Sequence, residues 1–138
     1  MTKYFRLVLM ALVSIAFIGC EMFNKKQTFN LSDLQGKWCT DGTQEYWRFT
    51  TDPVAGETGY FWGCEWNEAQ DWHESDLVYH GVGWFKYKLT DDQLIEWHMT
   101  DYGWSEIAQE YVITILTSTK MTYYKKGYPA EKQSFTKQ

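Results

Sequence analysis

The sequence predicts an all-β protein: an up-and-down antiparallel meander of seven or eight strands that closes into a small β-barrel. Apolar and polar residues alternate with period two through segments rich in aromatic and β-branched residues. Short polar turns separate these segments, and aromatic residues, which favour strands, make up 19% of the chain. Closure removes the exposed edges of such a sheet. A two-sheet β-sandwich is the alternative fold.

The N-terminal segment carries an export signal. Lys3 and Arg6 precede an apolar run over residues 7–18, and Gly19 follows it. This run is too short to cross a bilayer as a permanent helix. Residues 1–19 are therefore predicted to be a secretory signal peptide that is not part of the fold.

Cys20 is the predicted lipid-attachment residue. The segment that ends at Cys20 resembles the bacterial lipobox, in which this cysteine becomes the lipidated first residue of the mature protein. The alternative is an ordinary cleaved signal. Residues 20–30 lack periodicity and are expected to form a flexible tether, which leaves residues 31–138 for the barrel domain. Acyl chains anchor stably without spanning, so we expect a lipid-anchored protein of the bacterial cell envelope, at the outer membrane.

The barrel elements follow in order from local patterns. Residues 31–34 are expected to form one helical turn capped by Ser32 or Asp33. The first strand ends at Cys39, and its Trp38 is predicted to lie across the closed end of the barrel. Later strands are predicted over residues 45–50, 59–66, 82–89, 94–99, 110–116, 120–125 and 134–136. The turns that join them include residues 41–42, 90–93 and 117–119.

Cys39 and Cys64 form an even pair in a compartment that permits disulfides, if Cys20 carries lipid. Strands that are two apart in a sheet lie nearly 10 Å from each other, farther than a bridge can reach. The two cysteines fall at the same end of an up-and-down sheet. We therefore expect a disulfide only where the barrel rim brings them together.

Composition and motifs exclude several functions. The formal net charge of −5 offers no attraction to nucleic acid. Five acidic residues gather in one connection: Glu65, Glu68, Asp71, Glu74 and Asp76. Neither His73 nor His80 stands at the spacing of a metal site, and neither a nucleophile elbow nor a phosphate-binding loop occurs. We expect no enzymatic activity, no cofactor and no metal.

Several short motifs resemble a known family when they are taken in order. Residues 34–38 resemble the Leu-x-Gly-x-Trp opening of lipocalin-like domains, and residues 45–49 with 59–60 resemble the strands that follow it. Residues 84–89, 111–117 and 134–137 continue the likeness to small lipocalin-like (calycin-type) lipoproteins of Gram-negative gut anaerobes. The resemblance implies an up-and-down barrel on a lipoprotein stalk, and it implies no particular ligand. No arginine follows Arg48, so the late arginine of true lipocalins has no counterpart.

The aromatic residues bear on function as well. Most are expected to fill the barrel, whose interior at eight strands is only just wide enough for side chains or one small ligand. Trp66, Trp72 and Tyr79 lie in or beside the acidic connection and are the candidate ligand-binding residues. The first hypothesis is a lipid-anchored envelope binding module that holds a small apolar or aromatic ligand, or a glycan. The alternative is a plugged-barrel lipoprotein that docks another envelope protein through its acidic connection.

Overall fold

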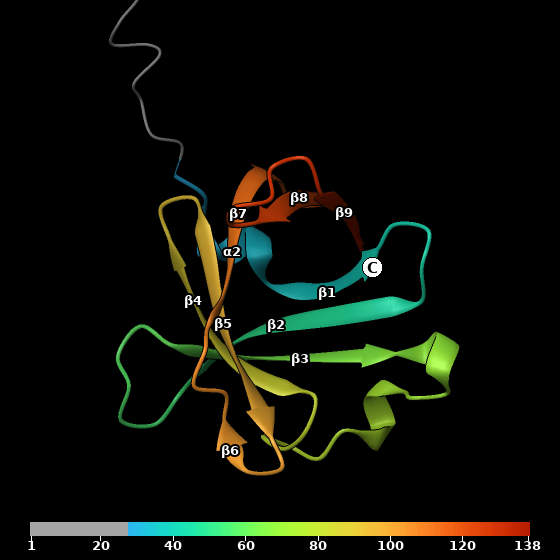
Figure 1. Ribbon diagram of the computed structural model, residues 1–138, viewed down its shortest axis with the longest axis vertical. Helices are drawn as coiled ribbons and strands as arrows, with labels where there is room; N and C mark the ends of the chain where they lie inside the picture. Colours follow the sequence, from blue (N-terminus) through green and yellow to red (C-terminus); the bar gives the residue numbers. More distant parts are fainter. Residues whose placement is uncertain (1–27) are drawn as a thin grey trace, which may run out of the picture.

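Eight antiparallel strands close into the predicted barrel in a computed structural model that describes residues 28–138 (Figure 1). The barrel strands are β1 (Gly36–Thr40), β2 (Glu45–Pro53), β3 (Phe61–Asn67), β4 (Trp84–Thr90), β5 (Gln93–Thr100), β7 (Gln109–Leu116), β8 (Lys120–Lys125) and β9 (Lys132–Lys137). Their order is β4-β3-β2-β1-β9-β8-β7-β5, and pairing of β4 with β5 closes the ring. A two-residue strand, β6 (Gly103–Trp104), pairs with the end of β5 outside the barrel. The barrel prediction is confirmed, and the sandwich is not formed.

The chain ahead of the barrel is described only in part. The predicted signal peptide, residues 1–19, and Cys20 lie outside the described residues, as does most of the tether at 20–30. Phe29, which the sequence assigns to the tether, packs against the barrel core, and its N–H donates to the carbonyl of Asp91 at 3.3 Å. The described residues contain no helix of the length and hydropathy needed to cross a bilayer.

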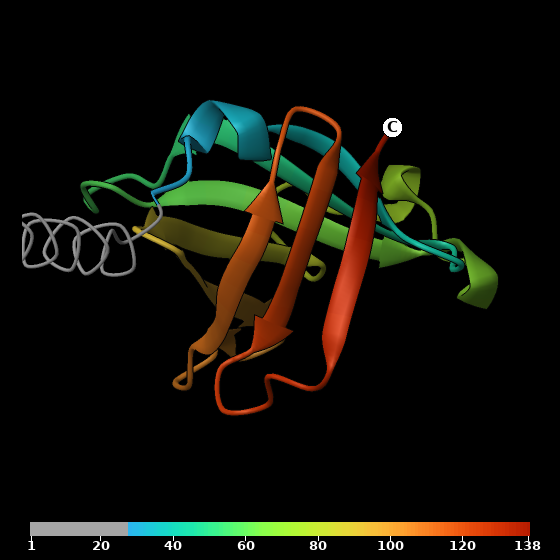
Figure 2. The ribbon, with the colours of Figure 1, turned by 90° about the horizontal axis from the view of Figure 1, so that it is seen from above.

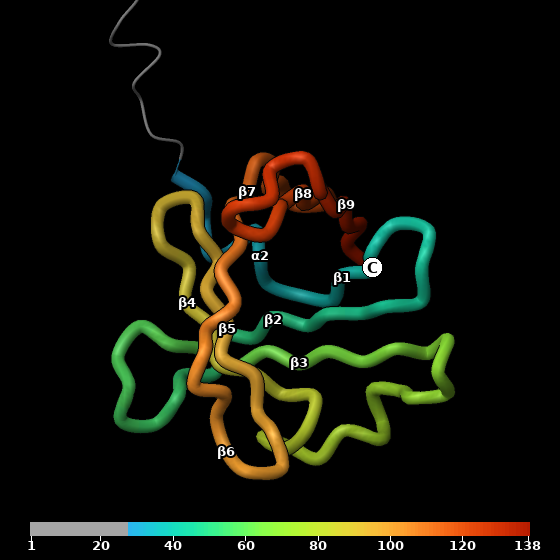
Figure 3. The backbone as a smooth tube through the Cα atoms, viewed as in Figure 1, coloured from blue at the N-terminus to red at the C-terminus, as the bar shows by residue number. Residues whose placement is uncertain are grey.

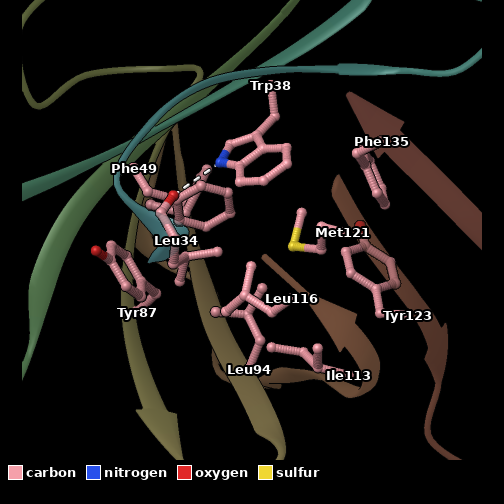
Figure 4. Close-up of a cluster of buried hydrophobic side chains, with 11 residues drawn as sticks. Leu34, Trp38, Phe49, Tyr87, Leu94, Ile113, Leu116, Met121, Tyr123 and Phe135 are labelled. Atoms are coloured by element: carbon pink, nitrogen blue, oxygen red, sulfur yellow. Dashed lines mark hydrogen bonds between the residues drawn. The ribbon is translucent and has the colours of Figure 1, made fainter. Parts of the chain in front are cut away.

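Trp38 and the short helix α2 (Leu31–Leu34) fill one end of the barrel (Figure 4). The indole N–H of Trp38 donates to the carbonyl of Leu34 at 2.7 Å, and both residues are fully buried. The Lys137 ammonium lies 4.8 Å from the centroid of the Trp38 ring and donates to the carbonyl of Asp33 at 2.8 Å. Trp38 therefore lies across a closed end of the barrel, the place predicted for it.

Apolar side chains from α2 and seven barrel strands pack the interior beside Trp38. The buried set is Leu34, Trp38, Phe49, Phe85, Tyr87, Leu94, Ile113, Leu116, Met121, Tyr123 and Phe135. Strand β3 places Gly63 against this core. A larger residue does not fit there, because a Cβ at position 63 would lie 2.4 Å from Cε2 of Phe85. This half of the barrel is filled by side chains.

Strand β7 departs from simple alternation. Ile113 pairs with Tyr123, whereas Ile115 pairs with Thr122, so one extra residue stands between them. Such a bulge exchanges the faces of the residues that follow it. Ile113 and Leu116 are consequently both buried, although they are three residues apart, and Ile115 is exposed. Period two alone assigns Ile113 and Leu116 to opposite faces.

A second, smaller core lies on the outer face of the sheet. It consists of Val54, Trp62, Cys64, Trp66 and Trp84. The connection from β3 to β4, residues 68–83, runs alongside the end of β3 and carries two 3-10 turns, η1 (Glu68–Gln70) and η2 (Glu74–Asp76) (Figure 3). Trp72 and Leu77 of this connection pack against the cluster. An ion pair of 2.6 Å between Arg48 and Glu74 ties the connection to β2. Burying this apolar face stabilises the otherwise polar connection.

The predicted disulfide between Cys39 and Cys64 is wrong, since both cysteines are free. Strand β2 lies between them: Cys39 pairs with Tyr46, and Cys64 pairs with Arg48. Strands that are two apart are separated by roughly 10 Å, and the two thiols are also offset by two residues along β2. The rim does not bring the strands together, because β2 extends at full pairing past both cysteines.

The barrel walls cross each other in the perpendicular view. Figure 2 shows β7, β8 and β9, in orange and red, passing over β1, β2 and β3, in blue to green. Residues 117–119 form the turn that joins β7 to β8, at one end of these three strands. The turn that joins β8 to β9 lies at the opposite end.

Candidate functional site

A cavity of about 310 Å³ occupies the end of the barrel away from α2. In β2, Phe49 pairs with Gly36 next to α2, and Trp47 follows at the next inward position away from the helix. Trp47, Tyr111 and Tyr123 supply three aromatic walls from β2, β7 and β8. The polar lining residues are Glu45, Lys125, Glu131 and Gln133. The barrel is thus filled at one end and hollow at the other.

Strand β5 places two ionisable groups inside the barrel. Thr90 pairs with Gln93, so only two residues form the turn from β4 to β5. Tyr87, buried in the core, then stands opposite Glu96, and the next inward residue, His98, stands opposite Phe85. Directly paired residues of an antiparallel ladder share a face. The turn therefore determines that Glu96 and His98 face inward.

Glu65, Glu96 and His98 form a hydrogen-bonded cluster, which we call the inner acid cluster. Nε2 of His98 lies 2.9 Å from Oε2 of Glu96, and Nδ1 lies 3.3 Å from Oε1 of Glu65. The Glu96 side chain is only 1% exposed. Its other oxygen, Oε1, has no hydrogen-bond partner among residues 28–138. A buried acceptor left without a donor costs free energy.

The protonation of the inner acid cluster follows from burial and charge. Burial alone would lower the pKa of His98, but hydrogen bonds to Glu65 and Glu96 outweigh it and raise that pKa to about 10. His98 is therefore an imidazolium at neutral pH, and both of its ring nitrogens donate. Burial raises the pKa of Glu96, and the contact with His98 opposes this rise in part.

Tyr111 and Tyr123 connect the cavity with the inner acid cluster. Their rings lie 4.4 Å apart, and both line the cavity. Burial raises the pKa of each phenol, and the negative charges of Glu96 and Glu65 raise it further. The Tyr111 hydroxyl donates at 2.5 Å to Gln109, which pairs with Glu96. The Tyr111 phenol therefore lies beside Glu96 on the inner face.

A smaller cavity of about 210 Å³ adjoins the first and shares Glu45 and Trp47 with it. Glu65 lines this second cavity, and its side chain is 32% exposed. The remaining lining residues are Tyr46, Trp66, Asn67 and Trp72. The inner acid cluster thus reaches the surface at the barrel mouth through Glu65.

The structure separates the three predicted ligand-binding residues. Trp66 and Trp72 both line the smaller cavity. Trp66 is not the exposed residue that the sequence suggests, because it is 2% exposed and stacks on Tyr46 with the ring centroids 5.5 Å apart. Tyr79 lines neither cavity; its hydroxyl donates to Asp52 at 3.2 Å, and its ring stacks on His80 at 3.7 Å.

The acidic connection uses most of its charges internally. Glu74 pairs with Arg48, and Glu68 accepts from the indole of Trp66 at 3.3 Å. His73 contacts Asp71 at 3.3 Å, and its backbone N–H donates to Asp76 at 2.8 Å. Glu65 is the exception, because it turns inward to His98. The five acids that form one cluster in the sequence therefore divide between a folded surface segment and the barrel interior.

Sequence reasoning missed Glu96 and His98. Alternation places Leu94, Glu96 and His98 on one face of β5 and leaves open which face is inward. The apolar residues Ile95 and Trp97 on the other face suggest the wrong one. The signal that identifies the inward face is the two-residue turn at Asp91 and Asp92, combined with the aromatic alternation of β4.

The site carries more negative than positive side chains. Four carboxyl groups line the two cavities or belong to the inner acid cluster: Glu45, Glu65, Glu96 and Glu131. Two cationic residues, Lys125 and His98, stand with them. Within residues 28–138, no group of three or more His, Cys, Asp or Glu side chains is arranged to hold a metal ion. The arrangement is suited to an organic ligand with hydrogen-bond donors.

Comparisons with protein-family models, curated proteins and solved structures found no match for this chain. The function is therefore inferred from the geometry of the barrel.

Proposed function

We propose that this protein is a non-enzymatic binding module, a lipocalin-like barrel anchored by lipid at Cys20 to the bacterial cell envelope. It holds one small ligand with an apolar or aromatic body, or a glycan, at the mouth of the barrel. The observation that carries the proposal is the cavity of about 310 Å³ between Trp47, Tyr111 and Tyr123. Ligand pockets span roughly 300 to 1,000 Å³ and combine aromatic walls with a few polar groups.

The distribution of packing supports ligand binding over a merely structural barrel. An eight-stranded barrel can be filled entirely by side chains, and the half next to α2 is filled in this way. The other half has large aromatic residues at its walls and still leaves space. It also buries a charged cluster, which a barrel selected only for stability would replace by apolar residues.

The lining residues favour binding over catalysis. Among the described residues that line the two cavities there is no serine, threonine or cysteine to act as a nucleophile. His98 is held as an imidazolium between two carboxylates, so neither ring nitrogen is free to accept a proton. General base catalysis by a histidine requires such a free nitrogen.

A second candidate function is docking of another envelope protein beside the acidic connection. It is favoured by exposed apolar side chains that follow η2: Val78, Tyr79 and Val82 are 72%, 62% and 51% exposed. The two functions use different faces, since none of these residues lines either cavity. Replacing Val78 by serine is expected to weaken such docking and to leave the cavity unchanged.

Native mass spectrometry of protein isolated from its own host tests the proposed function. Gln133 points into the cavity opposite Tyr123, and its neighbour Ser134 pairs with Thr122 on the outer face. We expect a small molecule to be retained by the wild type and by Ser134→Trp, and to be lost from Gln133→Trp, whose indole fills the cavity. Retention of no molecule by the wild-type protein would contradict the proposal.

Membrane fractionation tests the anchor separately. The Cys20→Ala variant cannot be acylated at this position and is expected to leave the membrane fraction. A Cys39→Ala variant is the matched control, because Cys39 lies in the barrel. This variant should remain membrane-bound. Partitioning of both variants with the membrane would rule out lipidation at Cys20.

A further inference from the structure

We propose, building on the proposed function, that the cavity selects a small organic amine in its ammonium form, with an aromatic or apolar body. The ammonium group binds Glu65 and Glu96, and the body packs between Trp47, Tyr111 and Tyr123. The inference rests on three features of the site: its charge, one unsatisfied buried oxygen, and its aromatic walls.

The charge of the site favours a cation. Four carboxyl groups and two cationic side chains line the cavities or belong to the inner acid cluster, and one of the cations, His98, is already shared between Glu65 and Glu96. Lys125, the other cationic residue, is exposed at the rim. Arginine, the side chain that holds carboxylates and phosphates best, is absent from the described lining residues. An anionic ligand would meet repulsion here, whereas a cation gains Coulomb energy in a site of low dielectric.

The unpartnered oxygen of Glu96 calls for a hydrogen-bond donor. Glu96 is 99% buried in the barrel, on the inner face, and Oε1 lacks a donor among the described residues. Glu96 pairs with Gln109, whose side chain accepts from the Tyr111 hydroxyl, so Glu96 lies beside one wall of the cavity. An ammonium N–H that reaches Glu96 beside the Tyr111 ring satisfies the oxygen with a charge-assisted hydrogen bond, which is stronger than a neutral one.

Glu65 provides the approach. Its carboxylate lines the smaller cavity at the surface and contacts His98 below. An amine that enters at the mouth meets Glu65 first and the buried Glu96 beyond it. The two cavities share Glu45 and Trp47, so they lie side by side at the mouth of the barrel.

The aromatic walls suit the rest of such a ligand. Tyr111 and Tyr123 lie 4.4 Å apart, and Trp47 closes the cavity from β2. Aromatic faces attract ammonium groups by a cation–π interaction and also bury apolar surface. A neutral glycan would use the same faces, but it would gain little from four carboxyl groups. The site therefore favours an amine with a flat body over a sugar.

Isothermal titration calorimetry at pH 7 with three matched indoles tests the ligand class. Tryptamine carries the ammonium, indole-3-ethanol is its neutral counterpart, and indole-3-acetate its anionic one. We expect the mature protein to bind tryptamine at least about ten-fold more tightly than the alcohol, the effect of one charge-assisted hydrogen bond. Indole-3-acetate should bind most weakly.

Neutral variants locate the recognition. Glu65→Gln is expected to weaken tryptamine binding about ten-fold and to change indole-3-ethanol binding less than two-fold. The matched control is Glu57→Gln, because Glu57 binds Lys86 on the outer surface at 2.8 Å and lies in neither of the two cavities. Glu96→Gln should act as Glu65→Gln does. Circular dichroism confirms that each variant is folded, and the partly exposed Glu65 keeps the test valid where Glu96→Gln does not fold.

The outcomes separate this inference from the proposed function. Equal or tighter binding of the alcohol or the acid overturns the amine and leaves a binding module in place. Binding of none of the three probes overturns the amine as well. In that case, a small molecule without a basic nitrogen retained by host-derived protein would still support the proposed function, and an empty host-derived protein would remove both.

Discussion

The inner acid cluster makes the stability of the protein dependent on pH in a calculable way. The perturbation that reveals this is the double substitution Glu96→Gln and His98→Gln, which replaces both groups by amides of similar size that can hydrogen-bond to each other. In the folded protein, two carboxylates raise the pKa of His98 from 6.5 to about 10 against the opposing effect of burial. Between pH 6.5 and about 10, His98 of the folded chain therefore keeps a proton that His98 of the unfolded chain releases.

The sign and size of the effect follow from that difference. The stabilisation by His98 is fully present below pH 6.5 and is lost as the pH rises through about 10. Where the folded state holds one proton more than the unfolded state, the free energy of unfolding falls by about 1.4 kcal/mol per pH unit. Between pH 7.5 and 9.5 we expect a loss of about 2 kcal/mol in the wild type, and little of it in the double variant.

Urea unfolding followed by tryptophan fluorescence measures this loss at both pH values. Burial also raises the pKa of the thiols of Cys39 and Cys64, so their ionisation in the unfolded chain destabilises both proteins near pH 9. The difference between wild type and double variant cancels that contribution. A double variant that loses as much stability as the wild type between pH 7.5 and 9.5 would refute the argument.

Three further perturbations test the barrel. Trp38→Phe removes an indole that donates at 2.7 Å to a carbonyl of α2, and it should lower the free energy of unfolding by about 2 kcal/mol in urea titrations. Gly63→Ala should cost about 3 kcal/mol, because the new Cβ would lie 2.4 Å from Phe85; an unchanged urea midpoint would contradict the packing. Burial raises the pKa of Cys64 to about 12, so Ellman's reagent at pH 8 should leave Cys64 unreacted in the folded protein and detect both Cys64 and Cys39 after unfolding in denaturant.

Local pattern predicted most of the strands. Alternation of aromatic and polar residues placed Trp47 and Phe49 on one face of β2, and both line or fill the interior. The two-residue strand β6 was missed, because a pattern of period two needs more residues than it has. The bulge in β7 was also missed, because a bulge is a change in the pairing between β7 and β8 and leaves no mark in the residue types of β7.

Predictions that required two distant segments to meet were less successful. Cys39 and Cys64 were expected to approach each other at the rim, and a fully paired β2 keeps them apart. Trp66 was expected at the surface, and the connection of residues 68–83 buries it. In both cases the outcome depends on the position of another segment, β2 or residues 68–83. The periodicity of the sequence carries no information about that position.

The sequence by itself determined which residues share a face of each strand and where the chain turns, because both depend on neighbours within a few positions. These local rules were sufficient for an antiparallel barrel with Trp38 near its beginning. The inward face of Glu96 and His98 depended on the register between β4 and β5, which the short turn at Asp91 and Asp92 sets. Only the tertiary structure decided that Glu65 joins them and that the far end of the barrel stays hollow. The physical reason is that the inward face of a strand is determined by its register with a neighbour, and a one-residue shift in register exchanges the two faces.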